Sequence, residues 1–93
     1  MVKNVVNNRR SEIEIISDIC KLSCNGAKKT ELLYQGNLSY TQLKEYLIFL
    51  TERNILEKLE NKDNGNSATY YKTTEKGLEF LNEVNKVLAY LNL

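Results

Sequence analysis

The sequence predicts one small α+β domain that is mainly α-helical. Two motifs, SEIE at Ser11 and SYTQ at Ser39, have the pattern of helix capping boxes, and each precedes apolar residues at helical spacing. Farther along, the turn-rich segment NKDNGNS separates ILEKLE from the β-forming segment ATYYKTT. We therefore expect three helices, a two-stranded hairpin and a final helix within the 93 residues.

The first helix is expected to begin after Ser11 and to run to about Ser23. Asn25 or Gly26 would end it in a left-handed conformation. Its apolar residues are Ile13, Ile15, Ile16, Ile19, Cys20 and Leu22. They spread over about 200° of the helix, at about 100° per residue, which is wider than one packing contact requires.

The second and third helices are expected at about Lys28–Gln35 and Tyr40–Arg53. Gly36 would end the second helix as a C-terminal cap, and Asn54 would stop the third in a left-handed conformation. One face of the third helix carries the apolar stripe Leu43, Tyr46, Leu47 and Leu50. Two helices joined by a short turn that contains glycine are typical of a helix-turn-helix.

The hairpin that follows these helices would be the wing of a winged helix-turn-helix. A final helix, from Glu75 onward, is expected after a cap at Thr74. The predicted organisation is an N-terminal arm at residues 1–9, a winged helix-turn-helix domain at residues 10–74, and a C-terminal dimerisation helix at residues 75–93.

Candidate DNA-binding residues lie at three places in this predicted fold. The third helix presents a polar face opposite its apolar stripe, and such mixed groups suit base edges and thymine methyl groups. Glu45 shares that face and would repel phosphate. The candidates are Tyr40, Thr41, Lys44 and Ile48 on this helix, Lys28 and Lys29 before it, Lys62, Asn64 and Asn66 near the hairpin tip, and Arg9 and Arg10 in the arm.

The final helix predicts a homodimer. Its apolar residues cover about 180° of the helix, too much for this small domain to receive alone. We expect Phe80, Val84, Val87 and Leu91 to form one half of the arc, and Leu78, Leu81 and Leu88 the other. One half would pack on the first helix and the other on a second copy, with Leu78, Leu81, Val84, Leu88 and Leu91 as the dimerisation candidates. The alternative is a monomer with a partly exposed final helix.

Composition restricts the possible functions. The net charge of +1 is low for a nucleic-acid-binding protein, although the local distribution of charge matters more than the total. The chain has no histidine and no phosphate loop, catalytic pair or metal motif. We therefore expect no enzyme activity, cofactor, metal or small-molecule substrate. Because no membrane span or signal peptide is evident, a cytoplasmic, nucleoid-associated location is expected.

Cys20 and Cys24 are the only cysteines. Their spacing of four differs from the usual spacing of zinc ligands, and helical geometry disfavours a disulfide between them. Buried, inert thiols are expected. An inter-chain disulfide and redox sensing are the alternatives.

The segment YQGNLSYTQLKEYLIFLTERNIL followed by YYKTTEKGLEFL closely resembles the small archaeal winged-helix DNA-binding proteins. These include chromatin-associated members that dimerise through a long final helix. The resemblance runs from about Arg10 to Leu91, and its most specific parts are YQGNLSY and TEKG. It implies an archaeal or archaeal-virus source, double-stranded DNA as ligand and a homodimer.

Near-neutral charge and a short final helix favour a transcription regulator with sequence-specific or semi-specific binding over an abundant DNA-coating protein. The alternative function is a winged-helix adaptor that binds other proteins and not DNA.

Overall fold

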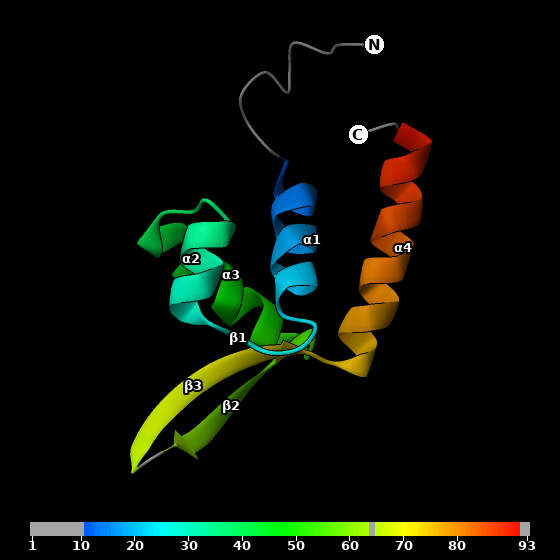
Figure 1. Ribbon diagram of the computed structural model, residues 1–93. Helices are drawn as coiled ribbons and strands as arrows, with labels where there is room; N and C mark the ends of the chain where they lie inside the picture. Colours follow the sequence, from blue (N-terminus) through cyan, green and yellow to red (C-terminus); the bar gives the residue numbers. More distant parts are fainter. Residues whose placement is uncertain (1–10, 64, 92–93) are drawn as a thin grey trace.

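The computed structural model describes residues 11–63 and 65–91 (Figure 1). Its elements are α1 (Glu12–Leu22), β1 (Ala27–Lys28), α2 (Lys29–Gln35), α3 (Tyr40–Glu52), β2 (Leu56–Asp63), β3 (Asn66–Thr73) and α4 (Glu75–Leu91). The predicted α+β, mainly helical fold and its element order are confirmed, with one added strand.

Both predicted capping boxes form. The Ser11 hydroxyl accepts a hydrogen bond from the Glu14 backbone N–H at 3.2 Å, and the Ser39 hydroxyl accepts one from the Gln42 N–H at 3.1 Å. Each bond satisfies a backbone donor that the first turn of a helix leaves free. Asn54, with φ 61°, adopts the left-handed conformation expected after α3.

The turn between α2 and α3 has Gly36 as the C-terminal cap of α2, as expected. Gly36 caps α2 with a right-handed backbone, at φ −81°, and Asn37 is the left-handed residue, at φ 53°. Glycine is needed at position 36 because a Cβ there would lie 2.5 Å from the carbonyl oxygen of Leu32. The sequence indicated the correct residue, but close packing rather than a positive φ requires it.

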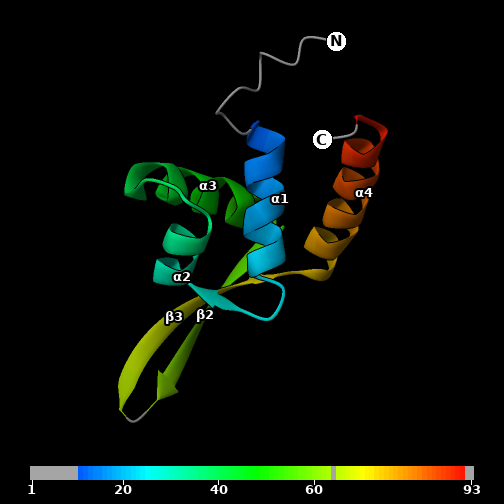
Figure 2. The ribbon, with the colours of Figure 1, turned by 45° about the horizontal axis from the view of Figure 1, so that its top comes forward.

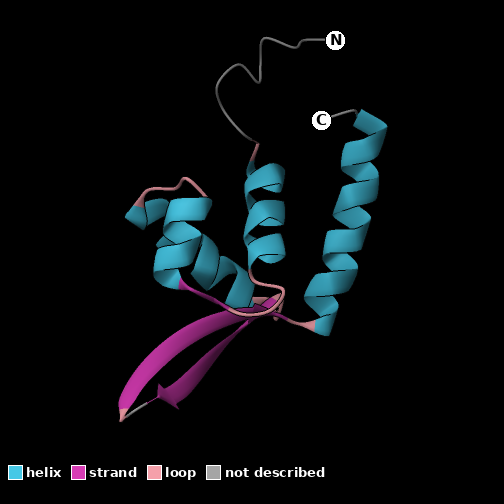
Figure 3. Cartoon of the chain, viewed as in Figure 1, coloured by secondary structure: helices cyan, strands magenta, loops and turns pink. Residues whose placement is uncertain are grey.

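The sheet has three antiparallel strands in the order β1-β3-β2, where only two were predicted. β1 pairs Ala27 with Tyr71 and Lys28 with Tyr70. The sequence did not reveal β1 because two residues are too few to show alternation. β2 and β3 continue past β1 as a two-stranded wing that projects away from the helices (Figures 1 and 3).

The core gathers side chains from α1, α2, α3 and β2. Ile19, Leu32, Leu43, Leu50 and Leu56 are almost completely buried there. In two views, α1 lies between α4 on one side and α2 and α3 on the other (Figures 1 and 2). This position explains the wide apolar arc of α1, which packs against α2 and α4.

The apolar arc of α4 is divided differently from the prediction. Leu81 and Val84, expected in opposite halves, are both buried within the chain, and Leu88 is partly buried. Leu78, Val87 and Leu91 are half-exposed. The reason is helical phase, since Gly77, Leu81, Val84 and Leu88 fall within about 60° of one another on an α-helix.

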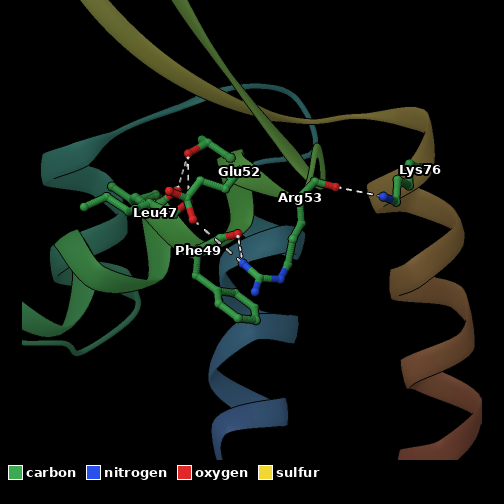
Figure 4. A network of polar contacts seen from close by, with 7 residues as sticks. Leu47, Phe49, Glu52, Arg53 and Lys76 are labelled. Atoms are coloured by element: carbon green, nitrogen blue, oxygen red, sulfur yellow. Dashed lines mark hydrogen bonds and ion pairs between the residues drawn. The ribbon is translucent and has the colours of Figure 1, made fainter.

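Close packing at the start of α4 sets that phase. The Thr74 hydroxyl donates to the Asn54 carbonyl at 2.6 Å, and the Thr74 N–H donates to the Ile55 carbonyl at 3.0 Å. The Lys76 ammonium donates to the Arg53 carbonyl at 2.9 Å (Figure 4). A Cβ on Gly77 would collide with the Ile55 carbonyl oxygen. The TEKG motif therefore ties α4 to the turn between α3 and β2.

Replacing Gly77 with alanine tests this packing. Glycine to alanine inside an open helix ordinarily stabilises a protein by up to about 1 kcal/mol. Here we expect Gly77→Ala to lower the free energy of unfolding by about 1–3 kcal/mol because of overpacking. Denaturant titration measures the change. Asn82→Ala, at an exposed position of the same helix, is the control and should change stability by less than about 0.5 kcal/mol. A stabilised Gly77→Ala variant would contradict the close approach.

Candidate nucleic-acid interface

The outer face of α3 is open along its length. Leu43, Leu47 and Leu50 point into the core. Thr41 and Lys44 lie exposed on the other side of the helix. Tyr40 and Ile48 are exposed with them. The third helix therefore has the buried and exposed faces that the sequence predicted.

A groove lies beside this face, between α3, the start of α2 and the base of the wing. It has a volume of about 230 Å³ and is lined by Lys29, Lys44, Leu47, Ile48, Thr51, Lys58 and Tyr71. Three of these seven side chains are lysines, and none of the seven is a carboxylate. We call this surface the lysine groove. Its charge suits a polyanion although the whole chain is nearly neutral.

Lys58 is a groove residue that the sequence analysis missed. It lies on β2 opposite Tyr71 of β3, beside the helices. Alternation along a strand places Lys62, four residues later, on the same face of the wing, and Lys62 is exposed. In the sequence, the even spacing of Lys58 and Lys62 indicates a shared face only if these residues form a strand, which the structure established.

The two lysines before the helix-turn-helix separate in the structure. Lys29 lies in the groove, with its ammonium 5.5 Å from the centroid of the Tyr40 ring. Lys28 belongs to β1, and its ammonium lies 5.7 Å from the ring of Tyr70. Tyr70 lines a different hollow, on the other face of the wing, together with Leu59. The structure therefore brings Lys29 to the groove and leaves Lys28 outside it.

Glu45 also lies outside the lysine groove. It lines a separate hollow of about 310 Å³ between α1 and α3, with Glu12, Ile16, Gln42, Tyr46 and Phe49. Glu45 follows Lys44 directly, and the turn of about 100° per residue directs the two side chains to different sides of α3. Glu45 therefore does not line the groove, but it is exposed on α3 within about 60° of Ile48, and the expectation that it would repel phosphate stays a prediction.

The remaining candidates lie at the edges of the described structure. Arg9, Arg10 and Asn64 fall outside the described residues. Asn66 is the first residue of β3, where its backbone pairs with Asp63.

The two cysteines are free thiols near the end of α1. The Cys24 thiol donates a hydrogen bond to the Cys20 carbonyl at 3.3 Å. Burial, and to a lesser degree the neighbouring Cys24, raises the pKa of the Cys20 thiol from its ordinary value of 9.0 to about 11. Because the thiolate is the reactive form, Cys20 is unreactive at neutral pH.

Within residues 11–63 and 65–91, no three His, Cys, Asp or Glu side chains come together in a group able to hold a metal ion. No helix formed by the same residues is long and apolar enough to cross a membrane.

A helix-turn-helix, a projecting two-stranded wing and a basic groove between them define a winged helix-turn-helix protein. The chain belongs to the winged helix-turn-helix family, whose model matches residues 9–91. Among solved structures, it is similar to Sso10a-2, a DNA-binding protein from Sulfolobus solfataricus, with 23% sequence identity and a TM-score of 0.74. The match covers 89% of this chain and 83% of that one.

This match confirms, at the level of the fold, the resemblance to small archaeal winged-helix proteins. Comparison with curated protein sequences yields no match.

The raised pKa of Cys20 predicts a loss of stability at alkaline pH. Between pH 9.0 and about 11 the unfolded chain releases the thiol proton and the folded chain retains it, so stability falls as pH rises through this window. The Cys20 contribution is at most about 3 kcal/mol. Denaturant titrations across the window measure it, with Cys20→Ala as the comparison. A steeper decline is expected in the parent protein, and parallel declines would contradict the assignment.

Proposed function

We propose that this protein binds double-stranded DNA as a homodimer and acts as a transcription regulator. Its role would be binding rather than catalysis, at specific or semi-specific sites in the nucleoid of the cytoplasm. The observation that carries the proposal is the lysine groove beside the exposed face of α3. A recognition helix in the major groove, with cations against the flanking phosphates, is how winged and related helix-turn-helix proteins bind DNA.

Further support comes from the match to Sso10a-2, which is described as a DNA-binding protein. The distribution of charge also supports DNA binding. Three lysines gather in the groove without a carboxylate, although the whole chain has a net charge of only +1. Lys62 and the residues of the arm, Arg9 and Arg10, would extend the basic surface beyond the groove.

The proposed dimer rests on apolar side chains of α4 that its own domain leaves half-exposed, chiefly Val87 and Leu91, which lie about 40° apart on the helix, whereas Leu78 lies about 180° from Val87. Leu78, Val87 and Leu91 stay half-exposed after α4 has packed on its own domain. Because each is already about half-buried, burying the rest against a second copy could contribute roughly 0.8–1.5 kcal/mol per side chain, before the costs of association. A two-fold axis there would present two α3 helices to one face of DNA, at half-sites about one helical turn apart or a multiple of that.

A protein-interaction adaptor is the second candidate function. The hollow between α1 and α3 supports it, because Ile16, Tyr46 and Phe49 give it an apolar lining and Glu12 and Glu45 give it acidic groups. An adaptor of this kind would bind a protein partner through that hollow and would not need the lysine groove.

Lysine substitutions on the two faces of the wing test DNA binding. Lys58 and Lys72 lie on neighbouring strands, but Lys58 faces the groove and Lys72 lines the hollow on the opposite face. Lys58→Ala and Lys44→Ala should weaken duplex binding and lower the slope of log affinity against log salt by about 0.9 for each phosphate that is no longer neutralised. Lys72→Ala should leave both quantities nearly unchanged. Fluorescence anisotropy over a salt series measures them.

Two results would count against the proposal in different ways. Equal losses of affinity from Lys58→Ala and Lys72→Ala would remove the lysine groove as the DNA-binding surface. Absence of binding to any duplex at low salt would contradict DNA binding altogether and would favour the adaptor.

Introducing negative charge on the half-exposed apolar residues of α4 tests the dimer. The double substitution Val87→Glu and Leu91→Glu should convert the dimer to a monomer, because it would bury four carboxylates in one interface. Sedimentation velocity measures the mass. Lys86→Glu, on the polar side of α4 where Lys86 pairs with Glu83 at 3.3 Å, is the control and should remain dimeric. A monomeric parent protein would contradict the proposed assembly.

A further inference from the structure

We infer that Ile48 gives the lysine groove a preference for thymine, through contact with the C5-methyl group in the major groove. This inference rests on the proposed DNA binding and names the chemical feature that the site would read.

Three apolar or aromatic side chains line the lysine groove, and they differ sharply in exposure. Leu47 is 3% exposed and Tyr71 is 6% exposed, because both belong to the core. Ile48 is 49% exposed. Ile48 is therefore the apolar side chain of this lining that can touch a bound partner, while the other two form the floor.

The polar neighbour of Ile48 has its hydroxyl already engaged. The Thr51 hydroxyl lies 2.7 Å from the Leu47 carbonyl and 3.1 Å from the Ile48 carbonyl, both within α3. Its single proton is used in this contact, so Thr51 has no free donor for a base edge. Beside Ile48, this surface therefore offers a base edge no free hydroxyl proton, although the Thr51 oxygen can still accept a hydrogen bond.

Three lysines line the groove together with Ile48, while the carboxylates one helical turn from Ile48 on α3, Glu45 and Glu52, are not part of the groove lining. Lys44 precedes Ile48 by one helical turn, and Lys29 and Lys58 line the groove from α2 and β2. Three ammonium groups without a carboxylate disfavour an apolar protein partner here and favour a polyanion. On the edges of the base pairs in the major groove, the C5-methyl of thymine is the apolar group. It is therefore the feature of duplex DNA that complements Ile48.

Deoxyuridine provides the test, because it lacks the methyl group and keeps the hydrogen-bonding edge of thymine. The probes are two duplexes of the same A·T-rich sequence, one with thymine and one with uracil throughout. The parent protein should bind the thymine duplex about fourfold more tightly for each methyl group that it touches, as expected for burial of one such group. Fluorescence anisotropy at fixed salt gives the ratio of the two affinities.

Three variants separate the sources of this ratio. Ile48→Ala should bring the ratio close to one. Lys44→Ala should weaken binding to both duplexes and preserve the ratio. Leu59→Ala should change neither the affinities nor their ratio. Leu59 is a suitable control because it is an exposed apolar residue on the opposite face of the wing. Thermal denaturation verifies that each variant is folded.

The outcomes are distinct for the two proposals. Binding of both duplexes with a ratio of one in the parent protein overturns the thymine preference and leaves the proposed function standing. A ratio that survives in Ile48→Ala also overturns it, because the preference would then come from DNA shape or from another side chain. Failure to bind either duplex at low salt overturns the proposed function, and the inference falls with it.

Discussion

The contact between the start of α4 and the turn after α3 is the constraint on which the arrangement of this protein depends. Backbone carbonyls of Arg53, Asn54 and Ile55 all accept hydrogen bonds from Thr74 or Lys76. β2 leaves this turn directly, and α4 follows directly from β3. One small cluster therefore fixes the directions of the wing and of α4 relative to α3, and it places the groove beside the exposed helix face.

A second set of bonds holds the base of the wing from the other side. The Thr73 hydroxyl donates to the Cys20 carbonyl at 2.7 Å, and the Thr73 N–H donates to the Ser23 carbonyl at 3.0 Å. Both acceptors lie at the end of α1, where helix carbonyls lack partners within the helix. Buried backbone groups are thus satisfied at the junction of α1 and the sheet, and β3 is held between α1 and β2.

The fold also explains how a nearly neutral chain obtains a basic groove. Lys44 and Glu45 are neighbours in sequence, and so are Glu57 and Lys58. Helical rotation separates the first pair, and strand alternation separates the second. In both pairs the lysine lines the groove. Glu45 lines the hollow between α1 and α3 instead, and Glu57 lies opposite Lys72 in the register of β2 and β3. Net charge was therefore a poor guide to this surface.

Local rules within the sequence determined the helices, their caps and the exposed face of α3. Ser11, Ser39 and Asn54 behave as expected because capping bonds and left-handed stops involve residues a few positions apart. Three features became known only from the tertiary structure: the pairing of β1 with β3, the place of Lys58 in the groove, and the side of α4 that packs on the domain. Those features depend on contacts between segments distant in the chain, such as Gly77 against Ile55, whose geometry no local pattern encodes.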